Sequence, residues 1–540
     1  MDLVPVRPAV ARPDPRLYAP QPMSFPARVS TRLLRGIPAL LLSPILGSGL
    51  GAQDEPRQTE SERVLQLSLE DAVRIALEQN LGLEAEAIAT EVARFNALGS
   101  WGSFDPIFST TGTAQEQEQQ GQSQLSGGSV VEDDSLQLNS SLSLPLTTGG
   151  SVDLTWFHSN DRTTNSFSLF DTSTTDVVTL SVRQPLLKGA WERYATTLQR
   201  EREIDLSTQT AREKEIRQRL VLDVYHAYWD LVSAIELVGV RVLAVDRAQT
   251  QLGQDKRRLE LGAGTEIDVL QSETTLAQQE ERLLNARFQQ RQAEDNLRRM
   301  LFQKPSGAME EFLLSWDWPI EPLTPLPRLP ADETPAPDWR RSWQLAIERR
   351  AELWQRRLAV DRAEVQLAAS ESGRLPTLDL NLSSSSAGFD SDPDEALSEA
   401  LGWDFPTNTA SLEFRVPLRN RSANYAERAA RAAVRQAHIA LDRQELDILA
   451  EVREAVRDLR YRAEALLATE KSSMLAERQL KAERVRMDIG LSTTFQVLQF
   501  QETLATARSD EVAARAAFAK ALVKLDHVEG GLDPKLGADE

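Results

Sequence analysis

The feature that most constrains this chain of 540 residues is an internal duplication. Residues 262–271 read Gly-Ala-Gly-Thr-Glu-Ile-Asp-Val-Leu-Gln, and they align without a gap with residues 490–499, Gly-Leu-Ser-Thr-Thr-Phe-Gln-Val-Leu-Gln. Each stretch lies between two helical patterns. Its first glycine can adopt the positive φ that ends a helix, and the threonine three positions later can cap the next helix. We therefore expect two copies of one unit, each built around the tip of a helical hairpin.

The patterns on either side of the tips recur in the same order. The predicted first unit, residues 66–302, has a helix, strands within 104–187, a long helix over 192–260, the tip at 261–265 and a helix over 265–302. The predicted second unit, residues 338–527, has a helix, strands within 376–418, a long helix over 421–489, the tip at 490–493 and a helix over 494–526. A proline-dense linker, 303–337, joins the units, and we expect the tail, 528–540, to be disordered.

The N-terminal residues 1–52 are predicted to be a secretory signal. Arginines precede a short apolar run at 37–46, and small residues follow it up to Ala52. The alternative is a transmembrane anchor, but the run is short for a bilayer and Pro44 interrupts it. The proline-rich start suggests that Met23 is the true first residue. Residues 53–65 are then a short N-terminal segment.

Composition argues against several classes of protein. The formal net charge is −20, which does not suit a nucleic-acid-binding surface. The chain has no cysteine, so disulfides, thiol chemistry and cysteine-based metal sites are excluded. The four histidines are scattered and none has the spacing of zinc ligands. The sequence therefore predicts no catalytic residue, no cofactor and no metal site.

Between the helices, the apolar residues alternate with polar ones. Leu142 and Leu144 alternate with serines, and Thr147–Gly150 is a tight-turn signal between two such runs. The predicted strands therefore have one apolar and one polar face. An antiparallel layer in a soluble domain and a layer facing lipid both fit this pattern, and periodicity alone does not separate them.

One copy of such a chain can neither bury all of its apolar surface nor close a barrel. A helix of about 69 residues is roughly 100 Å long at 1.5 Å per residue. A rod of that length and only four helices thick has no compact core, so it must bury apolar stripes against its own repeat and against other subunits. Four to six strands also cannot close a barrel, because about eight is the practical minimum.

Together these features resemble the TolC-like outer-membrane efflux family. The tips, the segments 179–187 and 227–231, and the order of helices and strands carry the resemblance, which covers about residues 66–527. It implies an α+β membrane protein with two tandem repeats of long antiparallel helices. In a homotrimer, these helices would form a helical tunnel and the strands would contribute to a shared transmembrane β-barrel.

The same resemblance implies the function. The trimer would be an outer-membrane exit duct of a tripartite efflux or type I secretion system in a Gram-negative bacterium. It would passively conduct substrates from a periplasmic adaptor and an inner-membrane transporter to the exterior. Its strands would contact outer-membrane lipid, its helices would lie in the periplasm, and no nucleic acid would be involved.

The resemblance also implies roles for tip residues. Family positions that carry acids at the tunnel entrance match Asp268, Gln496 and Gln499, of which only the first is an acid here. A charged ring at the entrance is therefore not expected from the second unit. The residues expected to form the adaptor-docking tips are Gly262, Gly264, Thr265, Gly490 and Thr493.

The first unit departs from the family in its strands. The segment from Pro106 to Gly262 is 42 residues longer than the matched segment from Pro376 to Gly490. The surplus coincides with an additional alternating pair at about 135–146 and 151–158. We hypothesise six strands per subunit instead of the usual four, which gives about 18 strands in a trimer. The alternative is a hairpin that extends two existing strands outside the membrane.

A periplasmic coiled-coil adaptor or scaffold without a channel is the alternative function. Such proteins also contain long helical hairpins, but usually one hairpin flanked by small β domains. This chain has two hairpins in tandem, with strands at the end opposite each tip. A duct should need detergent for extraction, whereas a scaffold should be soluble.

Overall fold

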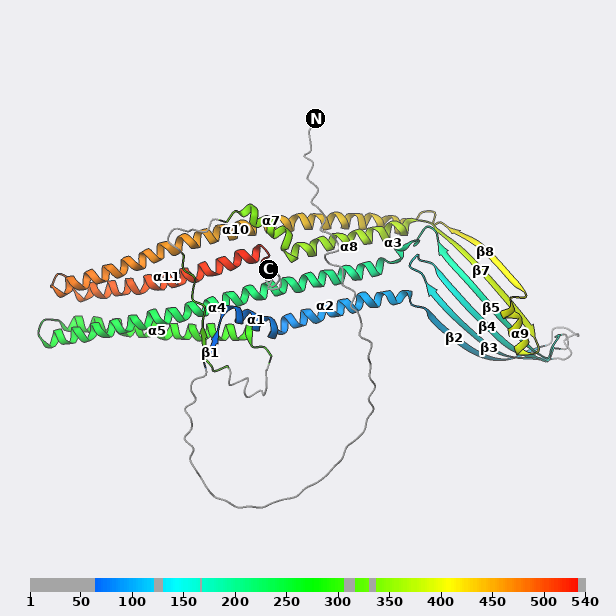
Figure 1. Cartoon of the computed structure of the whole chain (residues 1–540), viewed down its shortest axis with the longest axis horizontal. Coiled ribbons are helices and arrows are strands. Elements are labelled where there is room, and N and C mark those ends of the chain that lie inside the picture. The colour runs from blue at the N-terminus through cyan, green and yellow to red at the C-terminus, as the bar shows by residue number, and fades with distance from the viewer. Residues whose placement is uncertain (1–63, 121–129, 166–167, 305–315, 330–336, 533–540) are drawn as a thin grey trace, which may run out of the picture. The chain divides into compact units, whose positions relative to one another are not determined.

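A computed structural model describes residues 64–120, 130–165, 168–304, 316–329 and 337–532 (Figure 1). The predicted signal, residues 1–52, lies outside the described residues, as do most of 53–65 and parts of the linker and tail. Residues 62–540 form one compact unit, and the elements below belong to it. Among the helices of the described residues, none is long and apolar enough to cross a membrane.

The order of the helices in the first unit is repeated in the second. The first unit contains α1 (Leu69–Gln79), α2 (Leu81–Ser100), α3 (Glu192–Ala195), α4 (Thr197–Glu260) and α5 (Glu266–Leu301). The second contains α7 (Trp339–Arg349), α8 (Ala351–Arg374), α9 (Pro393–Gly402), α10 (Arg421–Asp488) and α11 (Thr494–Val528). The predicted helix over 192–260 is interrupted at Thr196, which leaves α3 as a single turn before the 64-residue α4.

The long helices lie side by side in one layer (Figure 1). On one flank α4 contacts α2 and α5, which lie end to end, and on the other it contacts α8 and α11. The 68-residue α10 contacts α8 and α11 in turn. Each long helix is therefore accompanied by two shorter ones of its own unit, and α4 joins the two units.

The helix predicted at the start of each unit is in fact two helices. The chain is extended at Asn80, between α1 and α2, and at Arg350, between α7 and α8. These positions match in the duplication. The Asn80 side chain accepts a hydrogen bond from the Leu83 amide at 2.9 Å and so caps α2. Arg350 has no such capping bond, and its side chain binds two glutamates instead.

Two short strands that the sequence patterns do not predict pack against the middle of α4. β1 (Leu65–Leu67) pairs in parallel with β6 (Ile320–Pro322), which lies in the predicted linker. The buried Tyr228 hydroxyl donates to the Leu67 carbonyl at 3.1 Å and accepts from the Thr324 amide at 3.0 Å. A segment predicted only as a proline-dense connection is therefore bound to the main hydrophobic core.

The remaining strands form one antiparallel sheet in the order β2-β3-β4-β5-β7-β8. Their bounds are β2 (Ile107–Gln120), β3 (Val130–Pro145), β4 (Ser151–Thr163), β5 (Thr172–Pro185), β7 (Thr377–Asp390) and β8 (Pro406–Arg415). The first unit supplies four strands and the second supplies two, and β5 pairs with β7 across the junction of the units. Sheet and helix layer are thus each shared by both repeats.

One face of the sheet is apolar and the other polar. Directly opposite residues in an antiparallel pair share a face, so Leu142 lies on the same face as Phe108 and Leu154. These three side chains are exposed in the single chain. On the same face, α9 covers part of β5 and β7. The strand pattern predicted within 376–418 does not include this helix, although Asp392 caps α9 and Pro393 begins it.

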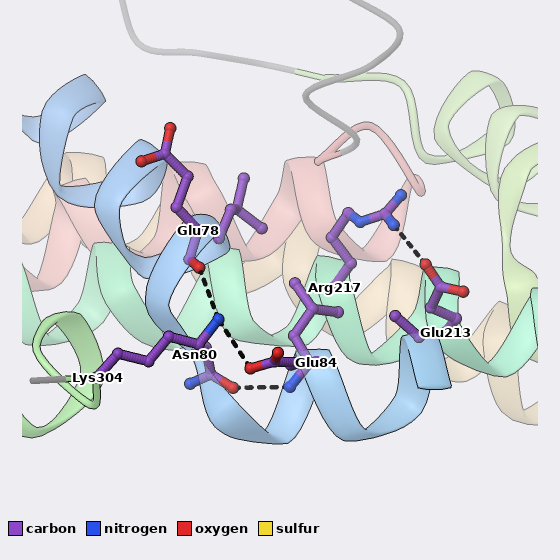
Figure 2. A pocket seen from close by; sticks show the side chains of 9 residues that line it. Glu78, Asn80, Glu84, Glu213, Arg217 and Lys304 are labelled. Atoms are coloured by element: carbon purple, nitrogen blue, oxygen red, sulfur yellow. Dashed lines mark hydrogen bonds and ion pairs between the residues drawn. The ribbon is translucent and has the colours of Figure 1, made fainter. Parts of the chain in front are cut away.

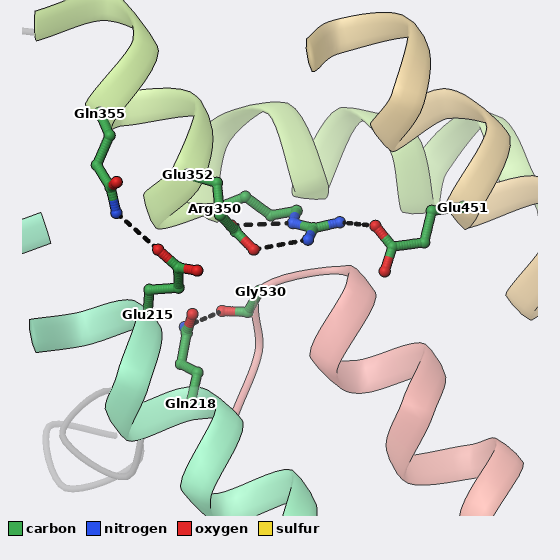
Figure 3. Close-up of polar contacts among 7 residues, drawn as sticks. All are labelled: Glu215, Gln218, Arg350, Glu352, Gln355, Glu451 and Gly530. Atoms are coloured by element: carbon green, nitrogen blue, oxygen red, sulfur yellow. Dashed lines mark hydrogen bonds and ion pairs between the residues drawn. The ribbon is translucent and has the colours of Figure 1, made fainter. Parts of the chain in front are cut away.

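The predicted tail is ordered at its start. α11 continues to Val528, and the chain then turns at Gly530, which has a φ of 76°. The Gly530 carbonyl accepts a hydrogen bond from the buried Gln218 side chain at 3.2 Å (Figure 3). The expectation of disorder is therefore wrong for residues 528–532, because this turn is fixed against α4.

Arg350, at the break between α7 and α8, is buried and forms ion pairs with two partly exposed glutamates, one of them on α10 (Figure 3). Its side chain, 8% exposed, contacts Glu352 at 2.7 Å and also Glu451 of α10. Burial alone would lower the pKa of Arg350, but the two glutamates outweigh burial and raise it. The guanidinium thus stays charged and fixes the α7–α8 break against α10.

We predict that Arg350→Met destabilises the protein by about 3 kcal/mol, because it leaves two partly buried carboxylates without their cation. Arg74→Met is the control, since Arg74 forms an exposed ion pair with Asp71 and such pairs contribute about 0–1 kcal/mol. Thermal unfolding of the purified protein, followed by circular dichroism, measures both. Equal shifts in the two variants would contradict a special role for the cluster.

The same cluster predicts a pH dependence. Burial would raise the pKa of Glu352, but the hydrogen bonds and charge of Arg350 outweigh it and hold the pKa below its ordinary value of 4.5. A depressed carboxyl pKa stabilises the folded state above the unfolded value, and this contribution is lost as the pH falls through the folded pKa. The difference in melting temperature between wild type and Arg350→Met should therefore be constant above pH 4.5 and shrink below it.

Candidate functional site

The two hairpin tips have the same backbone geometry. Gly262 and Gly490 have φ values of 71° and 76°, in the left-handed region that glycine adopts without strain. Each ends its long helix with the same pair of backbone hydrogen bonds, a Schellman motif. The bonds run from Gly262 to Leu259, Ala263 to Arg258, Gly490 to Met487 and Leu491 to Arg486, at 2.8–3.0 Å.

The helices that follow the tips begin at threonine caps, as expected. The Thr265 hydroxyl accepts a hydrogen bond from the Asp268 amide at 3.3 Å, and Thr493 accepts one from Gln496 at 3.4 Å. In the first unit the Asp268 carboxylate also accepts from the Thr265 amide at 3.1 Å, which completes a capping box. Gly264 lies close to the Arg258 side chain, where an added Cβ would approach it to 3.1 Å.

The entrance candidates therefore differ between the units. Asp268 is half-buried and its carboxylate is engaged in the cap, so local structure alone accounts for an acid at this position. Gln496 and Gln499 are exposed, and the Gln496 side chain accepts from Ser492 at 2.9 Å. A role of these three residues at a tunnel entrance stays a prediction.

Sequence reasoning missed a buried carboxylate near each tip. Asp255 is 2% exposed and accepts from Ser272 at 2.6 Å and from Thr494, in the other unit, at 3.2 Å. Glu483 is 5% exposed and accepts from Ser492 at 2.5 Å. The two acids occupy matched positions in the duplication, which is the signal that could have revealed them. Because Thr494 begins α11, Asp255 also bonds the two hairpins together.

Both tips present apolar side chains to solvent. They are Leu261, Ile267 and Leu270 in the first unit and Ile489, Leu491 and Phe495 in the second, all more than half-exposed. Leu261 matches Ile489, and Ile267 matches Phe495. Exposed apolar groups clustered in this way mark interaction surfaces.

A cavity of about 490 Å³ lies elsewhere, at the break between α1 and α2 (Figure 2). Lys304 pairs there with Glu84 at 2.7 Å, and Arg217 pairs with Glu213 at 2.7 Å. Since these cations already face acids, the cavity suits a structural role better than ligand binding. Within the part of the chain that the structure describes, no group of three or more His, Asp or Glu is placed to hold a metal ion.

We predict that Gly490→Val loosens the second tip, because a β-branched residue in the left-handed region costs about 1–2 kcal/mol. The expected result is faster tryptic cleavage after Arg486, read by mass spectrometry. Gly253→Ala is the control, because Gly253 lies inside α4 with open space around it, and alanine there should stabilise by about 0.5–1 kcal/mol. Unchanged cleavage of the valine variant would show that the tip tolerates the strain.

Comparison with known proteins gives one family match. The family described as outer membrane efflux protein matches residues 151–301 and 343–531. The two matched segments fall in the two structural units, and they include both tips and the strands β4, β5, β7 and β8. The matched residues make up more than half of the chain.

Individual proteins similar to this chain agree with the family match. The chain is 26% identical to the proteases secretion protein PrtF of Dickeya chrysanthemi over 400 residues, which are 72% of this chain and 80% of that protein. The CmeC outer membrane channel of Campylobacter jejuni has a similar fold, with a TM-score of 0.59, 14% identity, and coverage of 87% of this chain and 88% of that one. The outer membrane protein VceC of Vibrio cholerae has a TM-score of 0.60, 16% identity, and coverage of 86% and 96%.

Proposed function

This chain belongs to the outer membrane efflux protein family, and we propose that three copies of it form an outer-membrane exit duct whose hairpin tips dock on a periplasmic adaptor. The family match favours a duct over the alternative of an adaptor or scaffold without a channel. The protein is accordingly located in the outer membrane.

The observation that carries the trimer is a pair of apolar stripes on the free edges of the helix layer. On one edge, α2 exposes Ile88, Val92 and Phe95, spaced as one face of a helix. On the other edge, α10 exposes Ile439 and Leu446, seven residues apart, which is the spacing of a coiled-coil seam. A layer one helix thick can cover both stripes by joining copies edge to edge, and a ring of copies leaves neither stripe uncovered.

The tips support adaptor docking. They lie at the ends of the hairpins away from the sheet (Figure 1). Two of the three exposed apolar residues at each tip recur at matched positions in the two units, so a trimer would present six similar tips at one end. A partner would have to bind a ring of exposed apolar side chains. Adaptor proteins have helical hairpins of their own, and the apolar face of such a helix can pack on this surface. An inner-membrane transporter would complete the assembly.

The transported substrate can be proposed only by likeness. PrtF is described as a proteases secretion protein, and it shares 26% of the aligned residues with this chain. The structural neighbours with channel descriptions share only 13–16% of their residues with this chain, so they inform the fold alone. We therefore favour secretion of a polypeptide over efflux of a small molecule.

We predict that Ile439→Glu combined with Leu446→Glu prevents trimer formation, because it buries two carboxylates in the seam without partners. Mass measurement in detergent should then give a monomer in place of a trimer. Leu491→Glu at the tip is the control and should leave the trimer intact. A stable monomer of the unmodified protein would refute the proposed assembly.

We predict the opposite pattern for docking. Leu491→Glu combined with Phe495→Glu should abolish export while the trimer and its outer-membrane location are retained, because only the tip surface is altered. Secretion assays and photo-cross-linking from position 491 to a periplasmic protein are the measurements. Gly490→Val should act in the same direction. Normal export by both variants would place the docking surface elsewhere.

A further inference from the structure

We propose that all six strands of each copy enter the shared barrel, so that β8 of one copy pairs with β2 of the next and about 18 strands enclose the pore. This inference rests on the proposed trimer and specifies its β-layer. It assigns the edges of β2 and β8 as the interaction surface and a second copy of this chain as the partner.

The additional hairpin of the first unit, β3–β4, is inserted in the middle of the sheet. β3 pairs with β2 from Ser143 opposite Ile107 to Val130 opposite Gln120. β4 pairs with β5 from Ser151 opposite Arg183 to Arg162 opposite Thr172. The hairpin therefore separates β2 from β5 along their lengths. A hairpin that merely prolonged two existing strands would leave β2 and β5 in contact.

The turn of this hairpin is held at the helix end of the sheet. Gly149 has a φ of 83°, and an added Cβ would lie 2.3 Å from the Gly189 carbonyl oxygen. The Trp191 amide donates to the Thr148 carbonyl at 2.9 Å. The turn thus docks on the connection between β5 and α3, where a short periplasmic turn of a barrel belongs.

The two edges of the sheet are complementary. β2 runs away from the helices and β8 runs back toward them, so copies placed side by side meet in antiparallel pairs. Residues that lie directly opposite one another on neighbouring strands form a row across the sheet. The row that starts at Ile107 of β2 ends at Thr409 of β8. The last residue of β8, Arg415, lies six positions further along the strand.

This offset fits a closed barrel. If β8 ends where the β2 of the next copy begins, the register slips by six residues over six strands, or one residue per strand. With about 3.4 Å per residue and about 4.8 Å between strands, the strands tilt by about 35°, and barrels typically have tilts of about 35–45°. The ends of β2 and β8 in one copy are therefore offset by an amount that matches a barrel of usual tilt.

The same register keeps the faces of the sheet consistent. It places Phe108 of one copy opposite Phe414 of the next on the apolar face, and Thr111 opposite Ser411 on the polar face. A slip of one residue would invert every side chain. The polar face, lined by residues such as Asn139, Thr155 and Asn381, would then surround a wide pore lined mainly by hydroxyl and amide side chains. Such a lining suits a hydrated polypeptide.

A cysteine pair tests the register. Thr111→Cys combined with Ser411→Cys should give disulfide-linked dimers and trimers on oxidation, because the positions meet only between copies. Within one copy they lie on opposite edges of the sheet, five strand spacings or about 24 Å apart. Thr111→Cys combined with Thr407→Cys is the control, since it is four residues out of register, about 14 Å. Linkage of the control pair instead of the test pair, or of neither pair, would overturn the proposed edge pairing.

Deleting the hairpin tests the width of the pore. Removal of residues 130–163 leaves β2 to pair directly with β5 in a four-stranded sheet. We expect this variant to stay trimeric and to exclude, from the outer side, polyethylene glycols that enter the wild-type channel in bilayer recordings. Equal exclusion limits would overturn the 18-stranded barrel while leaving the trimer standing.

The two tests also separate this inference from the function it rests on. Failure of the wild-type protein to form a trimer in detergent would refute the proposed duct itself, and the barrel with it. If the deletion variant does not fold, the cysteine pair in the full chain still decides the edge pairing.

Discussion

A layer one helix thick cannot bury the apolar residues of its own long edges, and this constraint governs the whole molecule. The long helices α4 and α10 cover each other only through α8 and α11, which leaves stripes on α2 and α10 open. The sheet has the same incompleteness at β2 and β8. A closed ring of identical copies would both bury the apolar stripes of the helices and pair the edge strands of the sheet.

The two units repeat the geometry more faithfully than the chemistry. The helix breaks at Asn80 and Arg350 have the same backbone form, but one is capped by an amide and the other is filled by a charged cluster. Both hairpins bury a carboxylate near the tip, but the partners differ. Asp255 accepts hydrogen bonds from hydroxyl groups of both units, whereas Glu483 accepts one from Ser492 of its own tip. Duplication has fixed the fold, and the side chains have diverged within it.

The sequence was sufficient for features encoded locally. The tips could be predicted because a glycine and a threonine cap act within a few residues. Strands such as β3 and β5 could be predicted because their apolar residues alternate with polar ones. The β1–β6 pair, the position of α9 on the sheet and the ion pairs of Arg350 depend on contacts between distant segments. The burial of Asp255 likewise depends on packing against Thr494, which no local pattern reveals.

The pairing of β5 with β7 delays the completion of the sheet during folding. Arg183 lies opposite Asn381, so the sheet cannot be completed until nearly two hundred further residues have been delivered. Contacts between such distant segments form slowly because the intervening chain must first be ordered. During that interval the four strands of the first unit have an unsatisfied edge at β5 as well as at β2. A chain of this design depends on protection from aggregation between its arrival in the periplasm and its assembly.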